Sequence, residues 1–110
     1  MEKVNLYKEK YDALENFYGW IDQGSSYEIA IGQSFYYSKK LNKFQEIIMA
    51  VTIATRFARC GRALPDKFQF QLKELLADSE NLNSQDYGLS EDEQRVLNEE
   101  IEEVKLSIKI

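Results

Sequence analysis

Apolar residues recur every three or four positions along most of this chain, which is the spacing that places them on one face of a helix. The first such stretch runs from about Glu2 to Ile21, and Gly24 follows its end. Charged residues such as Lys8 and Glu15 fall between the apolar positions. The pattern predicts an amphipathic helix whose inward face carries Val4, Tyr7, Tyr11, Leu14, Tyr18 and Ile21.

A second helix is predicted from Ser25 to about Lys40. Ser25 is followed three residues later by Glu28, which is the spacing of a capping box. Apolar residues also alternate over 27–31, as they would in a short strand, but the alternation stops at Gln33 and a helix is favoured. The expected inward residues are Tyr27, Ile31, Phe35 and Ser38.

The third stretch is the most apolar of the chain. Asn42 and Gln45 again have the capping-box spacing, and Gly61 stands where a glycine commonly follows a helix end. A helix that is apolar on most of its faces is usually the central one. The sequence therefore predicts a central helix with an inward stripe of Phe44, Ile47, Ile48, Val51, Ala54, Phe57 and Ala58, widened by Met49, Ala50 and Ile53.

Two more helices complete the pattern. Pro65 precedes a predicted helix over about Asp66–Ala77, and the polar stretch 78–90 indicates a loop. Ser90 and Glu93 form a third capping-box pattern and open the last helix. The expected inward residues are Phe68, Leu72, Leu75 and Leu76 in one helix and Leu97, Ile101, Val104 and Ile108 in the other.

These elements predict an all-α fold, a single-domain bundle of about five helices spanning residues 1–110. Apolar residues also alternate from Val104 to Ile110, so the last few residues are either helical or extended. At 110 residues the chain is long enough to bury a core without disulfides or metal.

The residue inventory excludes several classes of function. The chain has no histidine and a single cysteine, Cys60, so histidine-based catalysis, an intrachain disulfide and cysteine-rich metal sites are ruled out. We therefore expect a protein that is not an enzyme and has no cofactor or metal site. No apolar run is long enough to span a bilayer and the first twenty residues lack a signal-peptide core, so a soluble, cytoplasmic protein is expected.

The negative charge is concentrated in the last third of the chain. Residues 1–77 carry 11 Lys/Arg and 9 Asp/Glu, a net charge of +2, whereas residues 78–110 carry 3 Lys/Arg and 10 Asp/Glu, a net charge of −7. A solvated helix face would explain such acids, and a calcium loop is disfavoured because its ligand pattern is missing. The functional interpretation is an anionic surface for a basic protein, with Asp86, Tyr87, Asp92, Glu99, Glu102 and Glu103 as the candidate partner-binding residues.

Basic residues give a second hypothesis. They gather around the start and the end of the central helix. Favourable interaction of cations with helix C-termini and ion pairs with acids would account for them. Phosphate binding is the alternative, although acids in the same part of the chain nearly balance the charge. The residues concerned are Lys39, Lys40, Lys43, Arg56, Arg59 and Arg62.

In size, helical pattern and the acidic segment NLNSQDYGLSEDEQRVLNEEIEE, the chain resembles the small α-helical immunity proteins of bacterial toxin systems, including contact-dependent growth inhibition and colicin-like bacteriocins. The resemblance implies a stoichiometric inhibitor that neutralises a cognate toxin, in particular a nuclease whose basic cleft the acidic surface would occupy. The alternative function is a small regulator or adaptor that binds nucleic acid or a larger assembly through the basic residues.

Overall fold

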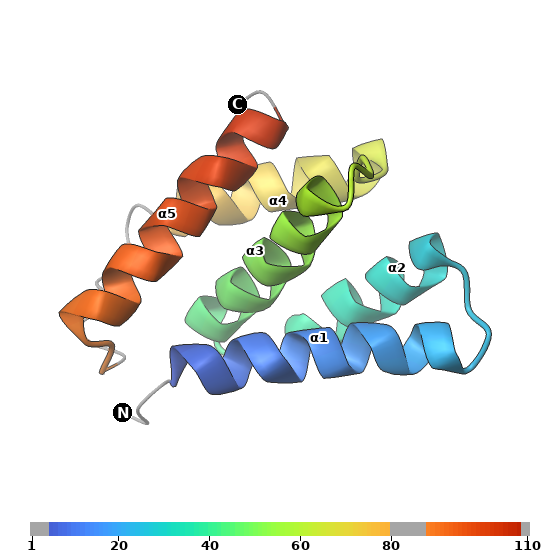
Figure 1. The fold of residues 1–110 in the computed structure, drawn as a ribbon, viewed down its shortest axis with the longest axis horizontal. Helices are drawn as coiled ribbons and strands as arrows, with labels where there is room; N and C mark the ends of the chain where they lie inside the picture. Colours follow the sequence, from blue (N-terminus) through green and yellow to red (C-terminus); the bar gives the residue numbers. More distant parts are fainter. Residues whose placement is uncertain (1–4, 80–87, 109–110) are drawn as a thin grey trace.

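Five α-helices make up the fold (Figure 1). The computed structural model describes residues 5–79 and 88–108, and no strand occurs in these ranges. The predicted all-α architecture is therefore confirmed, and the helical alternative holds for the chain end as far as Ser107. The helices are α1 (Leu6–Asp22), α2 (Tyr27–Ser38), α3 (Lys43–Arg59), α4 (Asp66–Ser79) and α5 (Glu91–Ser107).

Side chains that accept hydrogen bonds from the first turn fix where four helices begin. The capping boxes predicted at Asn42 and Ser90 are both present, each with its reciprocal hydrogen bond. The prediction for α2 was wrong by one residue, because Ser26 rather than Ser25 caps the helix and accepts a hydrogen bond from the Ile29 N–H. The helix α1 begins at Leu6 and is capped by the side chain of Asn5, and the predicted start at Glu2 lies outside the described residues.

The ends of the helices also differ slightly from the predictions. The prediction that α2 reaches Lys40 was wrong, because Lys40 and Leu41 donate to the carbonyls of Tyr37 and Ser38 in a tight turn. The end of α3 follows the prediction, since Gly61 adopts a positive φ of 73° that favours glycine.

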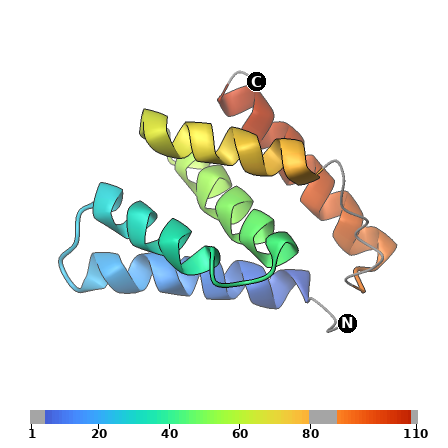
Figure 2. The same cartoon turned by 180° about the vertical axis from the view of Figure 1, so that it is seen from behind.

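The central helix is α3, as predicted. It lies between a layer formed by α1 and α5, which is nearest the viewer in Figure 1, and a layer formed by α2 and α4, which is nearest in Figure 2. Every residue of α3 from Glu46 to Thr55 is buried. The widening residues Met49, Ala50 and Ile53 are buried with the rest of the stripe except Ala58, which is half-buried near the end of the helix. The helix α3 thus supplies the core against which the other four helices pack.

The predicted inward face of α1 was wrong at its tyrosines, whereas Ile21 packs against the core as predicted and Val4 lies outside the described residues. Tyr7 and Tyr11 are exposed, at 57% and 66%, while Leu6, Ala13 and Phe17 are buried. The exposed tyrosines and the buried residues are offset by one position along the chain, which is about 100° around the helix. Within each set the residues are separated by whole turns, so either set has the spacing of an inward face. The structure buries the set that has no hydroxyl to hydrogen-bond, and the tyrosines keep theirs in water.

The inward residues predicted for α2, α4 and α5 are buried with one exception, although α4 continues to Ser79 instead of ending near Ala77. Ile31, Phe35 and Ser38 of α2 are buried, and so are all eight inward residues predicted for α4 and α5. Tyr27 was predicted to be buried but is exposed at the start of α2, where its ring packs edge-on to Phe57.

Candidate protein-interaction surface

The acids of α5 fall into two rows on different sides of the helix. Glu93, Glu100 and Glu103 form the inner row, which faces α1 and α3. Glu93 accepts a hydrogen bond from the Leu6 N–H at 3.0 Å. Glu100 is buried and forms an ion pair with Lys10 of α1. The inner row therefore attaches α5 to its neighbours.

Glu103 completes the inner row through Arg59 at the end of α3. Both oxygens of the Glu103 carboxylate accept hydrogen bonds from the Arg59 guanidinium, each at 3.2 Å. This hydrogen bonding, with the attraction of the Glu103 charge, raises the pKa of Arg59. The pair is partly open to solvent and joins α3 to α5 near the surface.

The remaining acids of α5 form the outer acidic face, which consists of Glu91, Asp92, Glu99 and Glu102. The side chains of Asp92 and Glu102 are 84% and 72% exposed. Among the described residues their ion pairs are local ones, from Arg95 to Asp92 at 3.5 Å and from Lys105 to Glu102 at 3.7 Å. No described residue forms an ion pair with Glu91 or Glu99. The face thus presents carboxylates whose ion pairs with described residues do not reach beyond α5.

A shallow hollow of ≈ 690 Å³ lies along this side of α5 and is lined by Glu91, Glu99, Glu102 and Glu103. Leu106, which also lines it, is 81% exposed and brings an apolar side chain to the end of the face. Sequence analysis did not single out Leu106, although its spacing of four from Glu102 indicates the same side of the helix.

Of the six predicted partner-binding residues, Asp92, Glu99 and Glu102 lie together on the outer acidic face. Glu103 borders that face but already binds Arg59. Asp86 and Tyr87 lie outside the described residues. The structure therefore brings three of the six together with carboxylates directed to solvent.

The basic residues do not form one patch. Lys39, Lys40 and Lys43 are at the N-terminal end of α3, and Arg59 is at its other end, about 24 Å away along a helix that rises about 1.5 Å per residue. Several are engaged within the chain. Lys43 pairs with Glu46 and Asp78, Arg59 pairs with Glu103, and Arg62 lies over the Tyr27 ring.

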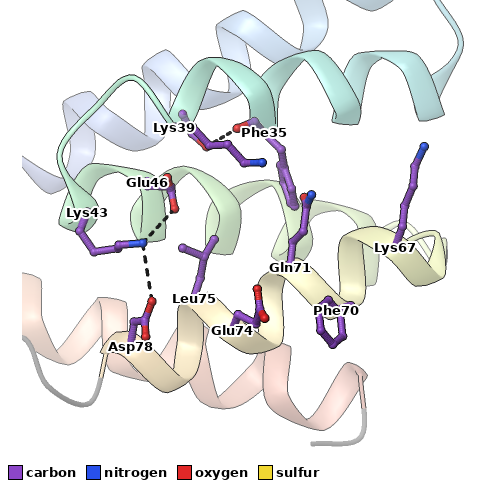
Figure 3. A pocket seen from close by; sticks show the side chains of 11 residues that line it. Phe35, Lys39, Lys43, Glu46, Lys67, Phe70, Gln71, Glu74, Leu75 and Asp78 are labelled. Carbon is purple, nitrogen blue, oxygen red and sulfur yellow. Dashed lines mark hydrogen bonds and ion pairs between the residues drawn. The ribbon is translucent and has the colours of Figure 1, made fainter.

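A separate groove opens between α2 and α4 on the other layer (Figure 3). It has a volume of ≈ 670 Å³, and Phe35 and Leu75 contribute apolar surface. At one end of the groove Lys43 lies between Glu46, at 3.5 Å, and Asp78, at 3.6 Å (Figure 3). Three lysines and three acids line the groove, so its charges balance and it lacks the net charge of the outer acidic face. The lining acids are Glu46, Glu74 and Asp78, and the lysines are Lys39, Lys43 and Lys67.

Three further features of the described ranges concern metal binding, the cysteine thiol and membrane spanning. They contain no group of three or more Cys, Asp or Glu residues placed to hold a metal ion. Cys60 is exposed as a free thiol. None of the described helices combines the length and apolar character needed to cross a membrane.

Comparison of the chain with protein-family models, curated proteins and solved structures found no match. The resemblance to immunity proteins therefore stays a prediction.

Proposed function

We propose that the chain is a stoichiometric protein inhibitor, an immunity protein that binds and neutralises a cognate toxin through the outer acidic face. The observation that carries this proposal is the division of the α5 acids into two rows. The inner row contacts α1 and α3, whereas the ion pairs that the outer row makes with described residues stay within α5. Carboxylates held on a rigid helix and left in solvent are suited to a basic partner.

The nature of the partner follows from the resemblance and from charge. A nuclease holds phosphates with lysine and arginine side chains, so its substrate cleft is positively charged. Carboxylates at Asp92, Glu99 and Glu102 would occupy the same contacts and accelerate association. A stable complex of this kind buries about 1,600 Å² in total, and the surface along α5 would contribute one part of each side.

The test is capture of the partner with the tagged protein from a bacterium that carries it. The expected result is one partner in equal amount whose nuclease activity is absent from the complex and appears after the inhibitor is stripped off under denaturing conditions and the partner is refolded. A stoichiometric partner without latent toxic activity would contradict the inhibitor assignment.

Charge-reversal variants identify the face. The double variant Glu99→Lys/Glu102→Lys should reduce capture strongly, while Glu103 is left in place so that its ion pair with Arg59 survives. The matched control is Asp22→Lys/Glu74→Lys, which makes the same change in net charge at exposed positions on α1 and α4. Equal loss in both variants would show that only overall charge matters and would contradict a role for α5.

The alternative function, a nucleic-acid-binding regulator, requires the basic residues to act together. Their separation at the two ends of α3 favours the inhibitor. Retardation of DNA or RNA that declines steeply with salt would nevertheless support the alternative.

A further inference from the structure

Two tyrosines of α1, Tyr7 and Tyr11, are largely exposed. Tyr7 and Tyr11 stand one turn apart, and no described aromatic ring or cation packs against either ring. Large exposed aromatic side chains are the residues that most often anchor protein interfaces. These two therefore need an explanation that the core does not provide.

Their neighbours in sequence contact α5. Tyr11 directly follows Lys10, whose side chain pairs with Glu100, and Tyr7 lies one turn before Tyr11 on the same side of α1. The backbone N–H of Leu6, in the first turn of α1, donates to Glu93 and shows that this end of α1 meets α5. Successive residues of a helix are about 100° apart around its axis. Each tyrosine is therefore turned from the α1–α5 contact by one residue step, toward solvent.

The acids of α5 show the mirror arrangement. Asp92 directly precedes Glu93 and Glu99 directly precedes Glu100, so each outer acid is one step back from a residue that contacts α1. Both helices begin at the lower left of Figure 1, and from there α1 runs to the right while α5 rises at an acute angle to it. When two adjacent helices begin at the same end, the residue after a contact on one helix and the residue before a contact on the other lie on the same outer side of the pair.

The tyrosine rings and the carboxylates together select one kind of side chain. A guanidinium stacks on an aromatic ring and also binds a carboxylate with two parallel hydrogen bonds, whereas an ammonium is a compact, strongly hydrated point charge. The protein already uses the first contact elsewhere, because the Arg62 guanidinium lies 4.0 Å from the centre of the Tyr27 ring. It uses the second between Arg59 and Glu103.

We infer that Tyr7 and Tyr11 of α1 and Asp92 and Glu99 of α5 form one docking surface that binds arginine side chains of a protein partner. The inference rests on the proposed function for the existence of that partner. It adds a second helix to the interface and assigns selectivity for arginine over lysine to the tyrosine rings.

The test uses two probes of equal charge, a nine-residue oligo-arginine peptide and a nine-residue oligo-lysine peptide, titrated into the ¹⁵N-labelled protein at low salt. The arginine peptide should bind several-fold more tightly, with amide shifts centred on residues 6–12 and 91–100. Tyr7→Ala/Tyr11→Ala should weaken arginine binding about tenfold and abolish the preference over lysine. Tyr7→Phe/Tyr11→Phe should keep both affinity and preference because the ring faces remain.

Tyr36→Ala is the matched control, since Tyr36 is 63% exposed but lies on α2 in the opposite layer. It should leave both affinities unchanged. Equal binding of the two peptides, or a preference that survives loss of both tyrosines, would overturn the inference. If Glu99→Lys/Glu102→Lys alone abolished binding while the tyrosine variants had no effect, the acidic docking of the proposed function would stand and the tyrosine contribution would fail. Absence of binding by either peptide would overturn the arginine surface directly, and the capture experiment would still decide the proposed function.

Discussion

The ion pair between Lys10 and Glu100 joins α1 to α5 at the edge of the core. Its two members differ in access to water, since the side chain of Lys10 is 23% exposed and that of Glu100 is 9% exposed. Removing the lysine leaves the Glu100 carboxylate unpaired where little water can reach it. Removing the acid leaves the Lys10 ammonium, which can reach water because its side chain is long and flexible. The two deletions are therefore unequal.

Lys10→Met should lower the free energy of unfolding by about 2–3 kcal/mol, and Glu100→Gln by about 1 kcal/mol. The double variant Lys10→Met/Glu100→Met should recover most of the loss, because two apolar side chains can replace a buried pair. Urea unfolding at constant pH measures all three. Equal losses in the two single variants would show that the pair behaves as an exposed one.

The Arg59–Glu103 pair is more open and should contribute less. Arg59→Ala should cost about 0.5 kcal/mol, because solvent screens an exposed pair. The pKa of Arg59 is raised in the folded protein, so the stabilisation due to this shift is complete below the unfolded pKa and is lost only as strongly alkaline pH passes the folded value. The difference in unfolding free energy between Arg59→Ala and the wild type should therefore be the same at pH 7 and pH 9, and a change between these pH values would contradict it.

At the scale of the element, α1 carries two stripes with helical spacing and buries only one. Phe17 packs edge-on to Phe57 with ring centres 5.5 Å apart, while Tyr11 lies in solvent. Phe17→Ala should lower the free energy of unfolding by about 3–5 kcal/mol, because it leaves a cavity in the core. Tyr11→Ala should change it by less than about 0.5 kcal/mol. Thermal unfolding followed by circular dichroism compares the two, and a large loss for Tyr11→Ala would show that the ring is packed after all.

The example of α1 also shows which parts of the fold the sequence could predict. Capping boxes at Asn42 and Ser90 were recognised because the capping contacts are local, within three residues. The stripe of α3 was unambiguous because nearly all of its faces are apolar. In α1 the two stripes had equal spacing, and the choice depended on which side chains fit against α3 and α5, which local patterns do not contain.

The candidate site was predictable to a similar extent. The many acids in the last third of the sequence pointed to α5. Which of them face solvent, as Glu99 does, and which face α1, as Glu100 does, depends on the rotation of the helix about its axis. A signal was present, since Glu100 lies three residues after Leu97 and four before Val104 and so adjoins the buried stripe. The pairing of Glu103 with Arg59 joins residues 44 positions apart and needed the tertiary structure.

At the scale of the molecule, four helices share their core contacts through α3. The radius of gyration of the Cα trace is 13.2 Å, close to the value of about 13 Å expected for a compact chain of this length. A core of this kind leaves no helix with a separate apolar cluster, so unfolding should be a single transition. Fluorescence of Trp20, on α1, and the helical circular dichroism signal should lose their native values at the same urea concentration. An earlier fluorescence change would show that α1 separates before the rest.

Charge is also unevenly distributed over the molecule. The helix α5 carries seven Asp/Glu and two Lys/Arg, a net charge of −5, so the electrostatic potential is negative on the α5 side. Such a field acts on the encounter of two proteins, whereas contacts made after docking determine how long the complex lasts. The proposed inhibitor should therefore bind its captured partner with an association rate that depends on salt and a dissociation rate that depends on it much less.

Stopped-flow association at increasing NaCl measures this directly. The association rate should fall at least about tenfold between low salt and 0.5 M, because the Debye length shrinks from about 30 Å at 0.01 M to a few ångströms. In Glu99→Lys/Glu102→Lys the low-salt rate should already be reduced and its salt dependence should be shallower. The control Asp22→Lys/Glu74→Lys has the same net charge but keeps the outer acidic face, so it should retain most of the dependence. If both variants lost it equally, total charge rather than its position on α5 would govern the encounter, and the outer acidic face would have no part in guiding the partner.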